Sequence, residues 1–293
     1  MLVVGEAITA FMRYPRETEL FFHGPFPSGA PVIFASAAAR LGVRVELAAG
    51  VGADPFGVQL YDRLIRHGVS TNLVTVDPSR PTAATFVTYN QDGSRDFVFY
   101  VEGTAAQSAE PAVLERISGV PDWLHISGSA LAFGGHTAET VWLAVERARE
   151  RGTPISLDPN VRKEVLHGDF QDRFDVLLEH AAVVFASQGE LETLGVAESV
   201  ITARGAVLVR KNGADGADVT TSSGSTHVDA PVVSEVDPDG AGDVFAAGYV
   251  AATLLGHIPE VAARIGCVVA AESVQVRGPL ESEVCNLSTY VGR

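Results

Sequence analysis

The stretch WLHISGSALAFGGHTAETVWLAVERARERGTPISLD, residues 123–158, decides the fold. It opens with an apolar run at Trp123–Ile126, continues with helical spacing over His136–Arg151, and closes with a second short run at Ile155–Leu157. A strand, a helix of this length and a further strand make a βαβ unit, which places both strands in parallel in one sheet. Open sheets of this kind bind ligands beyond the carboxyl ends of their strands, so a site is expected at that edge.

The same alternation extends in both directions along the chain. It predicts an α/β fold with a Rossmann-like, mostly parallel sheet flanked by helices. Residues 215–229, with turn residues at 222–225, predict a hairpin. Further strands are expected at 2–4, 45–49, 183–185 and 207–210, and further helices at 32–41, 55–66, 170–179, 244–255 and 259–273.

Two segments, at about 8–23 and 82–101, interrupt this alternation. Both hold short alternating or aromatic runs with turn residues and no helical spacing, so each predicts a pair of antiparallel strands. A small β-sheet that projects from the main sheet and covers the site as a lid would explain both. Ordinary surface hairpins are the alternative. No linker or internal repeat is evident, so residues 1–293 are expected to form a single domain with this lid.

Composition narrows the classes of partner. The 293 residues are 46% hydrophobic and 19% charged, with a formal net charge of −15. This acidic balance disfavours nucleic acid as a partner, because such binding depends on Lys and Arg. The longest uncharged apolar run, Val244–Gly256, is too short to cross a bilayer. Only two cysteines, Cys267 and Cys285, and no signal-peptide pattern at the start favour a cytoplasmic protein.

The sharpest chemical motif is VDPDGAGDVFAAGYVAATLL, residues 236–255, where a Gly-Ala-Gly run leads into a long apolar helix. Glycines allow a tight turn with N–H groups aimed at one point, and the helix N-terminus adds partial positive charge. Gly240, Ala241 and Gly242 are therefore candidates for an anion hole that holds a phosphate. Asp243 beside it fits a base that takes the proton of an attacking hydroxyl. The alternative is an N-cap role for Asp243.

Two further motifs follow predicted strands. LDPNVR, residues 157–162, places Asp158, Asn160 and Arg162 at a carboxyl strand end, where Arg162 could clamp a phosphate or carboxylate. A Pro-containing turn with an Asx hydrogen bond is the alternative reading. In VLVRKNGADGADV, residues 207–219, Lys211 precedes a Gly213–Gly216 loop. That loop would let a nucleotide approach the backbone, although a β-turn alone also explains it.

The sequence FASQGELETLG, residues 185–195, contains Ser187 and Glu190 at capping-box spacing. The functional alternative is that Glu190 holds the water shell of a magnesium ion. The chain has no paired metal-ligand spacing such as HExxH or CxxC, and it lacks the P-loop and G-x-S-x-G patterns. Zinc sites, P-loop nucleotide binding and the hydrolase elbow are therefore disfavoured.

Taken in order, these motifs resemble the ribokinase-like, or PfkB, carbohydrate kinases over nearly the whole chain. GEAITAF at Gly5, SGAPVIFASAAARLG at Ser28 and VGADPFG at Val51 are similar to the opening signatures of that family, and DPNVR, KNGADGA and DGAGDVFAAG follow in its order. The resemblance implies a ribokinase-like fold and ATP-dependent phosphorylation of a sugar-like hydroxyl, with ATP, Mg²⁺ and optionally a monovalent cation as cofactors. Asp243 would be the base. Lys211, Gly213 and Gly216 would face the nucleotide. Gly29, Asp158, Asn160 and Arg162 would bind the substrate, and Glu190 would serve the metal. Homodimers formed through the lid are common in such kinases.

The sugar end departs from the family pattern. The usual aspartate falls at Ala10, the usual asparagine at Ile33, and an arginine of the similar 2-keto-3-deoxygluconate kinases at Val101. The phosphoryl end is retained. We therefore expect a kinase acting on a sugar, a sugar acid such as 2-keto-3-deoxygluconate, or a related hydroxyl compound. A nucleoside kinase, or a nucleotide- or sugar-binding protein with little turnover, are the alternatives.

Overall fold

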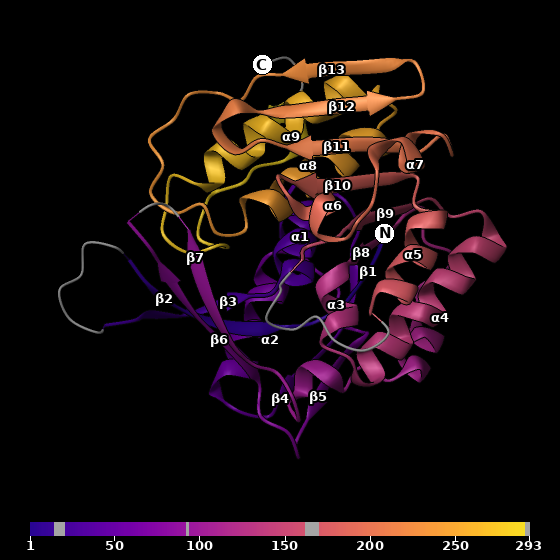
Figure 1. The fold of residues 1–293 in the computed structure, drawn as a ribbon. Coiled ribbons are helices and arrows are strands. Elements are labelled where there is room, and N and C mark those ends of the chain that lie inside the picture. Colours follow the sequence, from indigo (N-terminus) through magenta and orange to yellow (C-terminus); the bar gives the residue numbers. More distant parts are fainter. Residues whose placement is uncertain (15–20, 92–93, 162–169, 291–293) are drawn as a thin grey trace.

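The computed structural model describes residues 1–14, 21–91, 94–161 and 170–290. Its main feature is a nine-stranded sheet with the strand order β13-β12-β11-β10-β9-β8-β1-β4-β5 (Figure 1). The seven strands from β5 to β11 are parallel, and β12 and β13 continue that edge as antiparallel strands. The strands are β1 (Leu2–Val4), β4 (Glu46–Gly52), β5 (Val74–Asp77), β8 (Leu124–Ser127), β9 (Ile155–Asp158), β10 (Val183–Ser187), β11 (Val207–Lys211), β12 (Ala217–Thr221) and β13 (Gly224–Val228).

Helices cover both faces of this sheet (Figure 1). One face carries α1 (Ala30–Arg40), α2 (Pro55–Arg66), α8 (Ala241–Leu254) and α9 (Pro259–Ser273), and the other carries α3 (Gly128–Ala132), α4 (Gly135–Arg151), α5 (Phe170–His180), α6 (Glu190–Thr193) and α7 (Glu198–Thr202). Successive side chains of β1 point to opposite faces of the sheet and are apolar on both, so both faces need a layer of helices. Val3 packs into the first layer, whereas Leu2 and Val4 pack into the second. Short 3-10 turns occur at Ala105–Gln107, Pro111–Arg116, Gly213–Asp215 and Leu287–Thr289.

Local sequence explains the start of α2. The Asp54 carboxylate accepts hydrogen bonds from the backbone N–H groups of Phe56 and Gly57, and Pro55 takes the first helical position, where no N–H is needed. Leu60 and Leu64 are buried one turn apart. The helix spans the residues that the sequence predicted. Among the described residues, no helix combines the length and apolarity needed to cross a membrane.

A second sheet of four strands, here called the lid, stands beside the main sheet with the order β3-β2-β6-β7 (Figure 1). It consists of β2 (Ile8–Arg13), β3 (His23–Ser28), β6 (Ala83–Tyr89) and β7 (Arg95–Tyr100). The predicted antiparallel pairs are both present, but β2 and β6 join them in parallel. The first lid segment also extends beyond the predicted limit, since β3 begins at His23 and continues to Ser28.

Candidate active site

Three neighbouring parallel strands deliver polar side chains to one edge of the main sheet. β9 ends at Asp158, β10 at Ser187 and β11 at Lys211. All three residues line a cavity of about 310 Å³ between this edge, the lid and the start of α8. The site therefore lies beyond the carboxyl strand ends, as the βαβ pattern predicted.

Lys211 and Asp158 form an ion pair at the base of this cavity, with Nζ 2.5 Å from Oδ2. The Asp158 side chain is 1% exposed, and burial raises the pKa of its carboxyl while the ammonium opposes that shift. Burial alone would lower the pKa of Lys211, but Asp158, together with the carboxylates of Glu190 and Asp243, holds that pKa above its ordinary value. The cavity floor thus contains a permanent cation surrounded by carboxylates.

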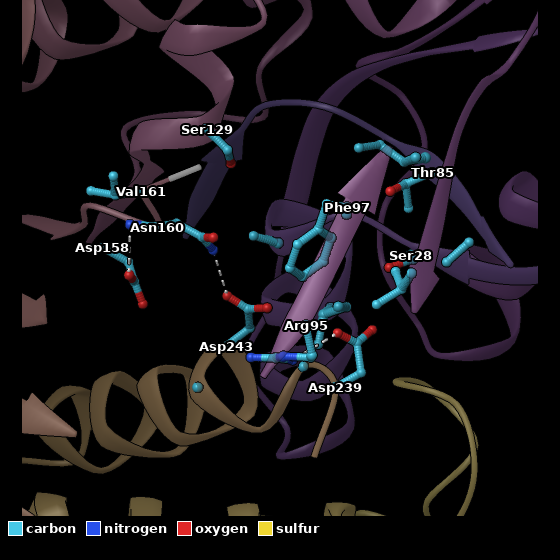
Figure 2. A pocket seen from close by; sticks show the side chains of 18 of the residues that line it. Ser28, Thr85, Arg95, Phe97, Ser129, Asp158, Asn160, Val161, Asp239 and Asp243 are labelled. Atoms are coloured by element: carbon cyan, nitrogen blue, oxygen red, sulfur yellow. Dashed lines mark hydrogen bonds and ion pairs between the residues drawn. The ribbon is translucent and has the colours of Figure 1, made fainter. Parts of the chain in front are cut away.

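Asp243 is the third residue of α8, whose N-cap is Gly240. The alternative reading of Asp243 as an N-cap is wrong. Its carboxylate is 8% exposed, lines the cavity, and accepts a hydrogen bond from Asn160 Nδ2 at 3.4 Å. Figure 2 shows the two side chains turned toward each other.

Asn160 is the only described non-glycine residue with positive φ, at 44°. Asparagine tolerates this conformation better than most residues. Its backbone N–H also donates to Asp158 Oδ1 at 3.2 Å, so the Asx turn exists. The turn does not exclude a role for Asn160 in the site, because in this conformation its side chain contacts the Asp243 carboxylate. Arg162 lies outside the described residues.

Glu190 lies at the first position of α6 and ties two strand ends together. One carboxylate oxygen accepts from Ser187 N at 2.6 Å, and the other accepts from Val161 N at 3.0 Å. In the predicted capping box, the Glu190 carboxylate would accept from the backbone N–H of Ser187, and this bond is present. The N-cap residue of α6 is Gly189, however, and no side chain caps the helix. Glu190 still lines the cavity. Among the described residues, no group of three or more His, Cys, Asp or Glu side chains is arranged to hold a metal ion.

The lid forms the opposite wall of the cavity, and that wall is largely apolar. Ala10 of β2 is buried and lines it, as do Phe97 and Phe99 of β7. Ile33, which belongs to α1, is also buried and lines the same cavity. Val101 does not line it, and packs instead with Ile8 and Phe133. The polar side chains on this side are Ser28, Thr85 and Arg95, which Figure 2 shows beside Phe97.

A second cavity of about 240 Å³ adjoins the first. Its lining is mostly apolar and includes Val232, Phe245 and Cys267. The two cavities share three lining residues, Lys211, Pro238 and Gly242. Asp243 lines the first cavity directly beside this junction.

The predicted glycines differ in what they do. Gly213 and Gly216 both line the second cavity. A Cβ at Gly213 would meet nothing within 4 Å, whereas one at Gly216 would lie 2.0 Å from the Val228 carbonyl oxygen. Gly216 is therefore required by strand packing, independently of any ligand. Gly29, with φ 107°, begins α1 and lines the first cavity, and a Cβ there would lie 2.8 Å from the Glu6 carbonyl oxygen.

Sequence reasoning missed several polar residues in and around the site, of which three matter below. Arg95 Nη1 lies 3.4 Å from Asp239 Oδ1, which joins the lid to the loop before α8 (Figure 2). Thr85 is buried in the cavity wall. Asp237 belongs to the same loop, is 1% exposed and does not line the cavity. Arg95 lies in the segment 82–101, which the sequence predicted to be a pair of antiparallel strands. The sequence does not show which strands lie next to each other in the lid, so it could not place these side chains at the site.

A lidded cavity that meets a second, mostly apolar cavity at a glycine-rich helix start is the arrangement expected of one class of protein, the small-molecule kinases. Known proteins agree. The family model described as pfkB family carbohydrate kinase matches residues 3–284. A fructokinase of Vibrio alginolyticus is 32% identical over 77% of this chain and 76% of its own length.

Two further proteins are informative. A 2-dehydro-3-deoxygluconokinase of Thermoproteus tenax is 31% identical over 87% of this chain and 81% of its own length. The structure of a Vibrio cholerae fructokinase with fructose, ADP and calcium has a TM-score of 0.86 at 25% identity, covering 99% of this chain and 97% of that one. The chain belongs to the pfkB family of carbohydrate kinases. Its ribokinase-like α/β fold is thereby confirmed.

Proposed function

We propose that the protein transfers the γ-phosphate of ATP to a hydroxyl of a sugar acid or a related acceptor with an apolar edge, with Asp243 as the general base. The observation that carries this proposal is the position of the Asp243 carboxylate, beside the junction of two cavities and in the first turn of α8. A base there reaches an acceptor in the first cavity and a phosphate arriving from the second.

In this mechanism the acceptor hydroxyl loses its proton to Asp243 as its oxygen bonds to the γ-phosphorus. The bond from that phosphorus to the β–γ bridging oxygen breaks, and ADP leaves. The N–H groups of Gly240 and Gly242 have no partners within the helix, so they suit the charge on the transferring group. The N–H of Ala241 already donates to the Pro238 carbonyl oxygen at 3.2 Å and would have to give up that bond to join them. Lys211, already charged and held by Asp158, adds a fixed positive charge at the junction.

ATP enters as its magnesium complex, which makes the metal part of the substrate. Glu190 faces the cavity, and its carboxylate is held rigidly by two backbone N–H groups. We propose that it orients the water shell of that magnesium ion. The apolar second cavity suits the adenine, with Gly213 as its open backbone edge.

The lid wall sets the acceptor class. The side chains of Ala10 and the phenylalanines on the lid, and of Ile33 on α1, offer no hydrogen bonds, and each acceptor hydroxyl left unpaired against them would cost about 1–3 kcal/mol. Arg95 supplies a cation in the cavity wall, and its guanidinium has donors beyond the one that contacts Asp239, which suits an acceptor carboxylate. A deoxy sugar acid such as 2-keto-3-deoxygluconate fits both features better than ribose or fructose. The parallel rings of Phe97 and Phe99, 5.6 Å apart, favour a nucleoside as the second candidate acceptor.

Thr85 is the polar group on this wall that most needs a ligand. It is 6% exposed, it lines the cavity, and its Oγ1 has no hydrogen-bond partner in the part of the chain that the structure describes. It pairs across the sheet with Ala10, whose side chain has no polar atom that could satisfy the hydroxyl. We propose that Thr85 binds an acceptor oxygen.

Thr9 provides a matched control for this proposal. It neighbours Thr85 in the lid, is 1% exposed and also has an unpartnered Oγ1, but it does not line the cavity. Thr85→Val should raise the acceptor KM about tenfold, the value of one hydrogen bond, and leave the ATP KM unchanged. Thr9→Val should leave both KM values unchanged. Equal kinetic effects of the two substitutions would contradict the assignment of Thr85.

A panel of sugars, sugar acids and nucleosides with ATP and Mg²⁺, followed as ADP release, tests the whole proposal. The largest kcat/KM is expected for a sugar acid. A largest value for ribose or fructose would refute the acceptor class. ATP binding without ADP release for any acceptor would instead favour the binding-protein alternative.

We also propose that two copies pair through the outer face of the lid. Val98 and Tyr100 of β7 are 53% and 60% exposed there, and a cluster of rings including Phe11, Phe22 and Phe86 lies beside them. Sedimentation of the wild type and of Val98→Glu tests this pairing. A monomeric wild type would contradict it.

A further inference from the structure

Besides the ion pair of Arg95 with Asp239, one buried carboxylate attaches the tip of the lid to the body of the protein. Asp237 Oδ2 accepts a hydrogen bond from the Tyr14 hydroxyl at 2.6 Å, and Oδ1 accepts one from the Tyr89 hydroxyl at 2.7 Å. Tyr89 ends β6, and Tyr14 directly follows β2. Both tyrosines are 8% exposed, so these bonds are shielded from water.

The same carboxylate also fixes the body on its other side. Oδ1 accepts from Asp239 N at 3.0 Å, and Oδ2 accepts from Gly278 N at 2.9 Å. Asp239 immediately precedes Gly240, the N-cap of α8. Asp237 therefore connects the tip of the lid to the loop that leads into the proposed anion hole.

Two ring contacts reinforce this attachment. The Tyr14 and Tyr89 rings stack with centroids 5.2 Å apart, and the Arg277 guanidinium lies 4.7 Å from the Tyr14 centroid. The bond to Asp237 and burial both raise the pKa of each tyrosine hydroxyl, so both remain proton donors at every working pH. Separation of the lid would take two of four donors from a buried carboxylate, which is costly.

We propose that Asp237 is a positioning residue that keeps the lid closed over the acceptor cavity by holding Tyr14 and Tyr89. The residues that line the two cavities predict which ligand depends on the closed lid. Lid residues such as Thr85, Arg95 and Phe97 line the first cavity, whereas none of the lid strands lines the second. Loosening the lid must then weaken acceptor binding and spare ATP binding. This kinetic consequence rests on the proposed function, whereas the closure of the lid does not.

The double substitution Tyr14→Phe and Tyr89→Phe tests this role, because it keeps the rings and removes only the hydroxyls. The acceptor KM should rise about tenfold to a hundredfold, as expected for hydrogen bonds to a charged group. The ATP KM and the kcat at saturating acceptor should change by less than about threefold, because the second cavity and Asp243 are untouched. Each single substitution should give a smaller rise in the acceptor KM.

Tyr290→Phe is the matched control. The Tyr290 hydroxyl also donates to a carboxylate, Glu272 Oε2, at 2.6 Å, but it lies in the body and lines neither cavity. It should leave the acceptor KM unchanged.

Amide hydrogen exchange without ligands provides a readout that is independent of the substrate. Exchange should accelerate across β2 and β6 in the double variant and stay at the wild-type rate there in Tyr290→Phe. Wild-type exchange in the lid of the double variant would overturn the proposal, whatever the acceptor is. So would an equal rise of both KM values. Faster lid exchange with an unchanged acceptor KM would uphold closure by Asp237 and refute the placing of the acceptor in the first cavity.

Discussion

Replacing Asp243 with asparagine separates catalysis from stability at this site. Asparagine keeps the shape of the side chain, and its oxygen can still accept the bond from Asn160. Two favourable charge interactions are lost, one with the α8 N-terminus and one with Lys211. The helix interaction is worth about 0.3–1 kcal/mol, and Lys211 keeps its 2.5 Å contact with Asp158, so the free energy of unfolding should fall by about 1 kcal/mol.

Catalysis should suffer far more. An amide cannot take the hydroxyl proton, and a positioned general base contributes about 10²–10⁴-fold to the rate. This corresponds to about 3–5 kcal/mol of transition-state stabilisation. ADP release measures kcat, and calorimetry should show ATP binding close to that of the wild type.

Asp172→Asn is the control for the loss of a helix charge, since Asp172 lies in the first turn of α5 and lines neither cavity. It should leave kcat unchanged. The reasoning fails if Asp243→Asn retains kcat within about tenfold of the wild type.

Three other substitutions test separate parts of the structure. Gly242→Val should abolish turnover and weaken ATP binding in calorimetry, because a Cβ there would already lie 3.1 Å from Lys211 Nζ at the junction of the cavities; normal ATP affinity would contradict this. Ala10→Asp combined with Ile33→Asn should shift kcat/KM toward ribose and fructose, and the two changes should be non-additive by about 0.5–3 kcal/mol because both residues line one cavity; strict additivity would argue against a shared substrate. Burial lowers the pKa of His125 from 6.5 to about 3, so between these pH values the unfolded chain binds a proton that the folded chain does not. The free energy of unfolding should therefore fall by up to about 1.4 kcal/mol per pH unit as the pH drops from 6.5 toward 3. Thermal unfolding of His125→Gln should show a shallower decline in that range, and an identical decline would refute this origin.

The order of strands and helices was predictable because most elements carry a clear periodicity. Helix α2 and the hairpin of β12 and β13 follow directly from their patterns. Strand β5, with the sequence VTVD, was missed because only Val74 is buried and the run is short. The parallel pairing of β2 with β6 was missed because 69 residues separate Arg13 from Ala83 and no local signal sets their register.

The sequence predicted individual residues of the candidate site but not the contacts between them. Motifs identified Asp158, Lys211 and Asp243, but not the ion pair between the first two. That contact depends on β9, β10 and β11 being adjacent in this order, which is a property of the whole sheet. The same limitation applies to Asp237, whose tyrosine partners are 223 and 148 positions away in the chain.

The wall shared by the two cavities has a consequence for inhibitor design. Only Lys211, Pro238 and Gly242 line both, so a single molecule could span the junction with a short anionic linker beside the Lys211 ammonium. Joining two weak ligands in this way makes the second contact intramolecular and raises the overall affinity far above that of either part. The half in the first cavity would carry the selectivity, because ATP is common to many enzymes whereas the first cavity presents the side chains of Phe97, Phe99 and Arg95.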